Sequence, residues 1–180
     1  MRWERLFADL EAQLAADEGR DLAFEVADRT RRERALLDLP ARLLASVGAT
    51  ITVVTGPSTV VGRLVDVGGD WLLLEPAPGR PVLVPLTALR AARGVGVGAA
   101  ATTVVGRRFG LASALRAVSR DRAVVEVLDL SGRGATGTID VVGADHLELA
   151  EHAPDEPRRA ANVHGVVLVP FTALASVRRL

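Results

Sequence analysis

The feature that most constrains the fold of this 180-residue chain is a segment that occurs twice. Residues 82–89 read VLVPLTAL and residues 167–174 read VLVPFTAL, so seven of the eight positions agree. A second pair of segments, 62–74 and 137–149, shares Gly, Asp and Leu positions at a spacing of 75 residues, against 85 for the first pair. The difference places ten extra residues between 151 and 164, in a stretch rich in Pro, Glu, Asp and Arg that is typical of an exposed insertion. Such self-similarity indicates that one structural unit is present twice in tandem.

Each copy has the same predicted order of elements, one helix followed by five short strands. The second strand of each copy contains a glycine, Gly62 or Gly137, where the missing side chain permits a sharp bend or bulge. Pro85 and Pro170 lack an amide donor, so we place them at the junction of the fourth and fifth strands. Five short strands with a bent second strand predict a small, strongly curved and partly open barrel, whose edges invite pairing with a neighbour. We therefore expect each copy to enclose its own hydrophobic core; halves that fold differently, or that merge into one sheet, would contradict this interpretation.

The rest of the chain is arranged around these two copies. Apolar residues at three- and four-residue spacing, starting from Trp3, predict N-terminal helices, and a Gly- and Ala-rich stretch separates the copies. The predicted organisation is an N-terminal helical arm at 1–40, a first barrel with its leading helix at 41–93, a linker at 94–106, and a second barrel with its leading helix at 107–180.

The longest uncharged run, residues 43–62, raises the question of a membrane span. It contains Gly48, Gly56 and Pro57 together with several Thr residues, and a spanning helix does not tolerate such a cluster of turn-forming residues. Near the N-terminus, Asp9 and Glu11 occupy the region where a signal peptide needs an apolar core. We therefore expect a soluble, cytoplasmic protein with no membrane partner.

A helix followed by Gly62-x-Leu64, Leu72-x-Leu74 and Val-Pro-x-Thr-Ala-Leu is a pattern that resembles the Sm-like (LSm/Hfq-type) family of small β-barrels. The resemblance covers residues 41–93 and 107–179. It implies rings in which the fourth strand of one barrel pairs with the fifth strand of the next, with uridine-rich RNA held in pockets around the ring. The whole chain, from its opening MRWERLFADLEAQ, is also similar to a family of proteins of high-GC bacteria.

The chain departs from the Sm-like pattern at two places. Members of that family have an Asp six residues after the glycine of the bent strand, where this chain has Gly68 and Gly143. The Lys-His pair with which the RNA chaperones of the family contact RNA aligns with Leu86-Thr87 and Phe171-Thr172. Neither copy therefore keeps the polar RNA pocket of the family, which weakens the expectation of RNA binding at that position.

No motif in the sequence indicates catalysis, a cofactor or a metal. Residues 132–137 read GRGATG and fit the dinucleotide fingerprint G-x-G-x-x-G, but they are predicted to join two strands, and the fingerprint needs a following helix to bind a pyrophosphate. His146, His152 and His164 lie near several acidic residues, and we interpret them as ordinary histidines of the barrel surface and the loop, and not as zinc ligands. The chain contains no Cys, which excludes thiol catalysis and thiolate metal sites. We predict a non-enzymatic protein without a cofactor or metal.

All 22 of the Lys and Arg residues of the chain are Arg. The stretch from Leu89 to Arg120 contains six of them and no acidic residue. Because arginine can fork onto phosphates and stack on bases, this stretch is the predicted nucleic-acid-binding site. Its members are Arg90, Arg93, Arg107, Arg108, Arg116 and Arg120. The alternative is that this basic stretch docks on the acidic N-terminal helices or on a second subunit.

Together these features predict an α+β, mainly β protein: two tandem Sm-like or SH3-like five-stranded barrels, each preceded by a helix, behind an N-terminal helical arm. We expect a homo-oligomer without catalytic activity that binds single-stranded RNA or another nucleic acid in a regulatory role. One alternative is an assembly module that self-associates through barrel edges and the N-terminal helices without nucleic acid. A second alternative, a small-molecule or metal-dependent enzyme, has no supporting motif.

Overall fold

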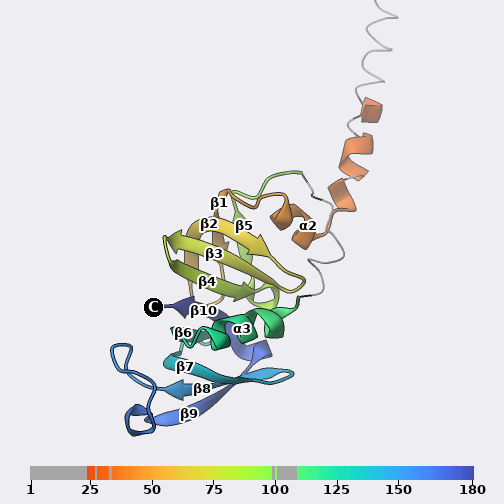
Figure 1. Ribbon diagram of the computed structural model, residues 1–180. Coiled ribbons are helices and arrows are strands. Elements are labelled where there is room, and N and C mark those ends of the chain that lie inside the picture. Colours follow the sequence, from red (N-terminus) through yellow and green to blue (C-terminus); the bar gives the residue numbers. More distant parts are fainter. Residues whose placement is uncertain (1–23, 27, 33, 99, 101–108) are drawn as a thin grey trace, which may run out of the picture. The chain divides into compact units, whose positions relative to one another are not determined.

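The computed structural model of the chain describes residues 24–26, 28–32, 34–98, 100 and 109–180 (Figure 1). The chain divides into two units, residues 1–38 and 39–180. In the first unit, residues 24–26, 28–32 and 34–35 are helical, and the remainder of the predicted arm up to residue 23 lies outside the described residues. The second unit holds both copies of the repeat.

The second unit is mainly β, as predicted. Its first copy supplies β1 (Thr50–Val54), β2 (Thr59–Val67), β3 (Trp71–Ala77), β4 (Arg80–Pro85) and β5 (Ala91–Arg93). Its second copy supplies β6 (Val124–Asp129), β7 (Gly134–Val142), β8 (His146–Glu151), β9 (Gly165–Pro170) and β10 (Leu174–Arg179). Helix α2 (Leu39–Leu44) precedes the first set of strands and helix α3 (Leu111–Arg120) the second. Short 3-10 helices follow β4 at Leu86–Ala88, precede β9 at Ala160–Asn162, and follow β9 at Phe171–Ala173.

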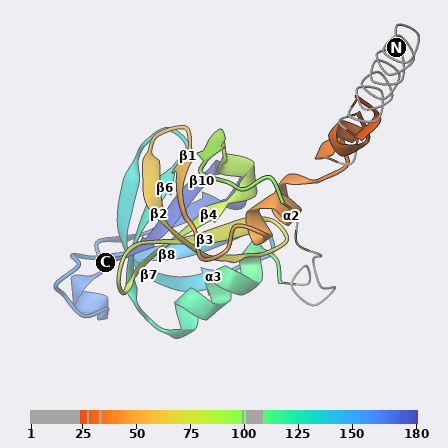
Figure 2. The same ribbon diagram turned by 90° about the horizontal axis from the view of Figure 1, so that it is seen from above.

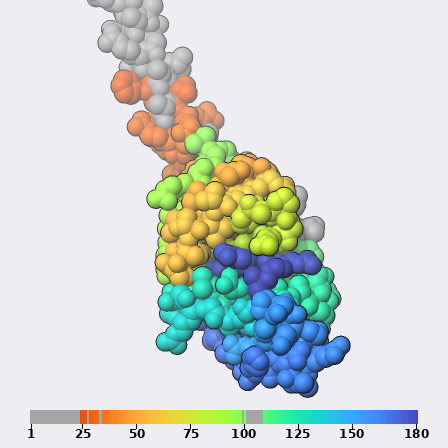
Figure 3. All heavy atoms as spheres, turned by 90° about the vertical axis from the view of Figure 1, so that its left-hand side faces the viewer, coloured from red at the N-terminus to blue at the C-terminus, as the bar shows by residue number. Residues whose placement is uncertain are grey.

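The ten strands form one continuous antiparallel sheet, in the order β5-β1-β2-β3-β4-β10-β6-β7-β8-β9, where separate barrels were expected. The halves meet where β4 pairs with β10, with Leu83 opposite Val177 and Val82 opposite Arg178. In Figure 3, β10 is the dark blue band between the yellow-green first copy and the cyan-blue second copy. The two strands pair because each is an edge of its own half and carries free backbone donors and acceptors.

Within each half the strand order is the same: fifth, first, second, third and fourth. The continuous sheet is the outcome that we expected to contradict two separately folded barrels, and the structure does not show such barrels. The shared strand order of the two halves agrees with a duplicated unit. The junction uses only the outer edges of the two halves, so it leaves the pairing inside each half unchanged.

Two clusters of buried apolar side chains lie within the second unit. The first cluster comes entirely from the first copy and includes Leu43, Ile51, Leu64 and Leu74. The second cluster is built mostly from the second copy, with α3 contributing Leu111 and Leu115, but it also includes Trp71 and Leu83 of the first copy. Helix α3 packs along β7 (Figure 2). The second core thus extends across the junction, so the prediction that each copy encloses its own core is wrong for the second copy: packing as well as strand pairing joins the two halves.

The two glycines of the bent strands are required by close approach of the next strand. A Cβ atom on Gly62 would lie 2.8 Å from the backbone nitrogen of Pro76, and one on Gly137 would lie 2.0 Å from the carbonyl oxygen of Ala150. Real Cβ atoms do not come that near to backbone atoms. Shortly beyond each glycine the register with the next strand shifts, by a bulge or irregularity between Leu64 and Asp66 or between Ile139 and Val141. A side chain at either glycine would force the strands apart.

None of the helices in the described ranges has the length and apolar character that crossing a bilayer requires.

Candidate functional site

Four of the six arginines of the predicted nucleic-acid site lie on two different elements. Arg90 precedes β5 and Arg93 ends it, whereas Arg116 and Arg120 lie on α3, and all four are exposed. Arg107 and Arg108 lie outside the described residues. Strand β5 is one edge of the sheet and α3 packs on β7 in the other half, so the fold does not gather the two pairs into one cluster (Figure 1).

Two of the three histidines, His146 and His152, form side-chain hydrogen bonds, and His164 bonds through its backbone amide to the carbonyl oxygen of Glu151. His146 Nδ1 lies 2.8 Å from Asp145 Oδ1, and this hydrogen bond lowers the pKa of the Asp145 carboxyl. His152 is buried, which the sequence interpretation missed: its Nε2 lies 2.8 Å from the Thr138 hydroxyl and its Nδ1 lies 2.8 Å from the carbonyl oxygen of Ala153. In the described part of the chain, no three His, Asp or Glu side chains are grouped in a way that could hold a metal ion.

The glycine-rich segment 132–137 lies between two strands, as predicted: its first two residues belong to the turn after β6, and residues 134–137 begin β7. Gly132 has a φ of +89°, so it supplies a turn that other residues rarely adopt. The carboxylate of Asp129 holds this turn, accepting hydrogen bonds from the Ser131 hydroxyl at 2.7 Å and from the amides of Ser131 and Arg133 at 2.8 and 2.9 Å. These bonds, that of the hydroxyl first, lower the pKa of Asp129. The segment is therefore a strand connection held by one aspartate.

Two neighbouring side chains of the first copy, Asp70 and Trp71, form hydrogen bonds to the backbone at the beginning of α3. The carboxylate of Asp70 accepts a hydrogen bond from the Leu111 amide at 2.7 Å, and Trp71 Nε1 donates to the carbonyl oxygen of Phe109 at 2.8 Å. A negative charge at the first turn of a helix is stabilising, because the free amides of that turn carry partial positive charge. In the second copy, Asp145 and His146 occupy the corresponding positions and bond to each other.

The same motif has opposite exposure in the two copies. Leu83 on β4 is 4% exposed, because β10 and the second core cover it, whereas its counterpart Leu168 on β9 is 61% exposed. Val166 on β9 is also exposed. Strand β9 ends the sheet, so nothing in the described part of the chain pairs with its outer edge. An apolar strand with a free edge is a site where another strand can pair.

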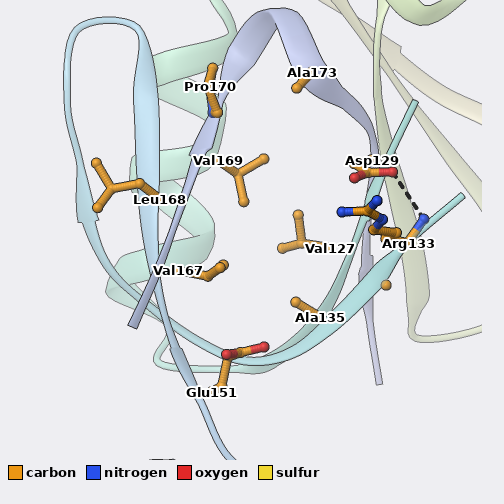
Figure 4. A pocket seen from close by; sticks show the side chains of 11 residues that line it. Val127, Asp129, Arg133, Ala135, Glu151, Val167, Leu168, Val169, Pro170 and Ala173 are labelled. Carbon is orange, nitrogen blue, oxygen red and sulfur yellow. Dashed lines mark hydrogen bonds between the residues drawn. The ribbon is translucent and has the colours of Figure 1, made fainter. Parts of the chain in front are cut away.

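A cavity of about 320 Å³ lies beside β9 (Figure 4). Apolar side chains from three strands form much of its wall, among them Val127, Ala135, Val167 and Val169. Asp129 and Arg133 lie next to each other on one side of it, and Glu151 lies apart from them (Figure 4).

The other end of the sheet is β5, the counterpart of β10. Its residues Ala91 and Arg93 are exposed and Ala92 is half-buried, whereas the corresponding Ser176 and Val177 on β10 are buried. Among the described strands, the second unit thus has two unlike edges without a pairing partner, and each corresponds to one side of the β4–β10 junction inside the chain.

Comparison of the sequence with protein-family models and with curated proteins finds no match.

Proposed function

We propose that the protein is a non-catalytic assembly module built from two tandem Sm-like five-stranded units, and that its chains associate head to tail. In this arrangement β9 of one chain pairs with β5 of the next, as β4 pairs with β10 inside the chain. The observation that carries the proposal is the contrast between Leu83 and Leu168, which hold the same place in the repeat. The strand edge that β10 covers on β4 in the first copy is uncovered on β9 in the second copy. The proposal keeps the expected homo-oligomer and assigns its contact to the sheet edges.

The contact is heterologous, because one patch of each chain meets a different patch of its neighbour. Such contacts produce rings where the rotation closes and filaments where it does not. Burying a leucine side chain contributes about 1.5–3 kcal/mol, so Leu168 is a suitable position at which to break the contact.

The test measures mass by light scattering over a range of protein concentrations for the parent protein and the Leu168→Arg variant. The expected result is a multiple of the monomer mass for the parent and a shift to monomer for the variant. Val61→Arg is the matched control, because Val61 on β2 is similarly exposed, at 55%, but lies inside the sheet order and away from both edges. A monomeric parent protein, or equal behaviour of the two variants, contradicts the proposal.

A second candidate is binding of single-stranded RNA, which the exposure of Arg90, Arg93, Arg116 and Arg120 favours. Binding through arginine–phosphate contacts releases counterions, so the affinity is expected to fall steeply with salt, and each lost contact lowers the slope by about 0.7. The measurement is fluorescence anisotropy of a labelled RNA with the parent protein and the Arg116→Glu, Arg120→Glu double variant. Absent or salt-independent binding rejects this candidate.

A further inference from the structure

We propose that the cavity beside β9 receives Arg93 of a second copy, with Glu151 as its carboxylate partner. The inference rests on the proposed head-to-tail association and adds to it the residues that define the register of the contact.

The register follows from the junction inside the chain. Arg178 of β10 lies opposite Val82 of β4. Arg93 is the counterpart of Arg178, and Val167 is the counterpart of Val82, in both cases at the repeat spacing of 85 residues. A second copy that repeats this pairing on β9 therefore places its Arg93 opposite Val167.

Strand geometry directs Arg93 toward the cavity. Side chains that lie opposite each other in an antiparallel pair extend from the same face of the sheet, and Val167 lines the cavity. Glu151 also lines it, from β8, where it lies opposite Gly165. The arginine of the second copy and Glu151 thus share one face, separated by β9 alone, and both side chains are long.

In the first copy, Arg178, the counterpart of Arg93, lines the cavity beside the strand with which it pairs. A corresponding cavity of about 250 Å³ beside β4 is lined by Arg178 together with Pro76, the counterpart of Glu151. Arg80 lines it as well, where the second copy has the side-chain-free Gly165. The second copy therefore replaces a proline by a carboxylate and has no arginine at the position of Arg80. Its cavity does contain Arg133, which lies beside Asp129 and apart from Glu151 (Figure 4).

Within the described residues, no ion pair engages Arg93 or Glu151. Arg178 pairs with Glu126 of the adjacent strand, at 3.5 Å between Nη1 and Oε2. Arg93 lies opposite Thr52 instead, which carries no charge. The two junctions thus differ in chemistry. At the β4–β10 junction, Arg178 pairs with Glu126 of its own half. At the proposed β9–β5 contact, Arg93 finds its carboxylate partner on the neighbouring chain.

The test uses charge reversal in the full chain. Arg93→Glu and Glu151→Arg are each expected to raise the dissociation constant of self-association, measured by sedimentation velocity, about tenfold or more. An equimolar mixture of the two variants is expected to recover the parent affinity, because alternating chains bring Arg93 against Glu151 at one contact and Glu against Arg at the next. Arg120→Glu makes the same charge change on α3 and is expected to leave the dissociation constant unchanged. The melting temperature of each variant shows that it is folded.

The outcomes separate the two proposals. A parent protein that stays monomeric, or one that associates equally well with Leu168→Arg, overturns the head-to-tail association and this inference with it. A parent protein that requires Leu168 but tolerates both charge reversals overturns the Arg93–Glu151 contact alone. Loss of association in both variants without recovery in the mixture also overturns the contact, because the two side chains then act separately.

Discussion

The paired leucines of the repeat allow the energetic weight of the β4–β10 junction to be measured directly. We predict that Leu83→Ala lowers the free energy of unfolding by about 3 kcal/mol. The lost transfer of roughly three carbons from water contributes about 2.4 kcal/mol, and the cavity left in the second core adds the remainder. Leu168→Ala removes the same atoms from a side chain that is 61% exposed, so its loss is expected to be about 1 kcal/mol or less.

The assay is urea unfolding followed by circular dichroism, at a protein concentration low enough that self-association does not contribute to the measured stability. In thermal unfolding, the Leu83→Ala change corresponds to a decrease of about 6–12 °C in Tm for a domain of this size. Equal losses for the two variants would refute the reasoning, because they would mean that β10 and α3 do not cover Leu83 as the structure has it. A loss below about 1 kcal/mol for Leu83→Ala would do the same.

Two further predictions concern single carboxylates. A hydrogen bond from Arg158 lowers the pKa of Asp140, so the stability from this pair is complete above about pH 4 and is lost as the pH falls through the folded-state pKa. Asp140→Asn should therefore make the free energy of unfolding in urea less dependent on pH in that range, and an unchanged pH dependence would contradict the prediction. Asp70→Ala removes the hydrogen bond to the Leu111 amide and should lower the free energy of unfolding by about 1 kcal/mol in the same assay. Asp145→Ala, at a side chain that is 89% exposed, should lower it hardly at all, and equal losses for the two variants would argue against the helix-capping role of Asp70.

The repeat carries most of what could be predicted about the fold. Glycines at 62 and 137 and prolines at 85 and 170 have steric consequences that act within a strand or between neighbouring strands, so their local roles can be read from sequence. The pairing of β4 with β10 is different, because nothing in the identical VLVP segments distinguishes the copy that is covered from the copy that is open. The burial of Leu83 depends on β10, a strand from far along the chain, whereas no strand of the described part covers Leu168, and the local sequence pattern does not distinguish the two cases.

The candidate sites show the same limit. The six arginines look like one basic stretch in sequence, yet β5 ends one edge of the sheet while α3 packs on the other half, and Arg107 and Arg108 remain outside the described residues. His152 sits in an acidic, Pro-rich neighbourhood that predicts exposure, and its burial depends on Thr138 of the adjacent strand. Glu151 belongs to no sequence motif, and its possible role as a binding partner becomes visible only when the two cavities are compared position by position.

The position of β10 has a consequence for how the chain acquires its structure. It follows the other nine strands of this sheet along the chain, yet it lies at the centre of the sheet order. A nascent chain therefore presents β4 as an uncovered edge throughout the synthesis of the second copy, and contacts between such distant segments form slowly. Until β10 arrives, the edge of β4 is open to strands of other nascent chains, so the intermediate with the first copy complete is the stage most exposed to misassembly.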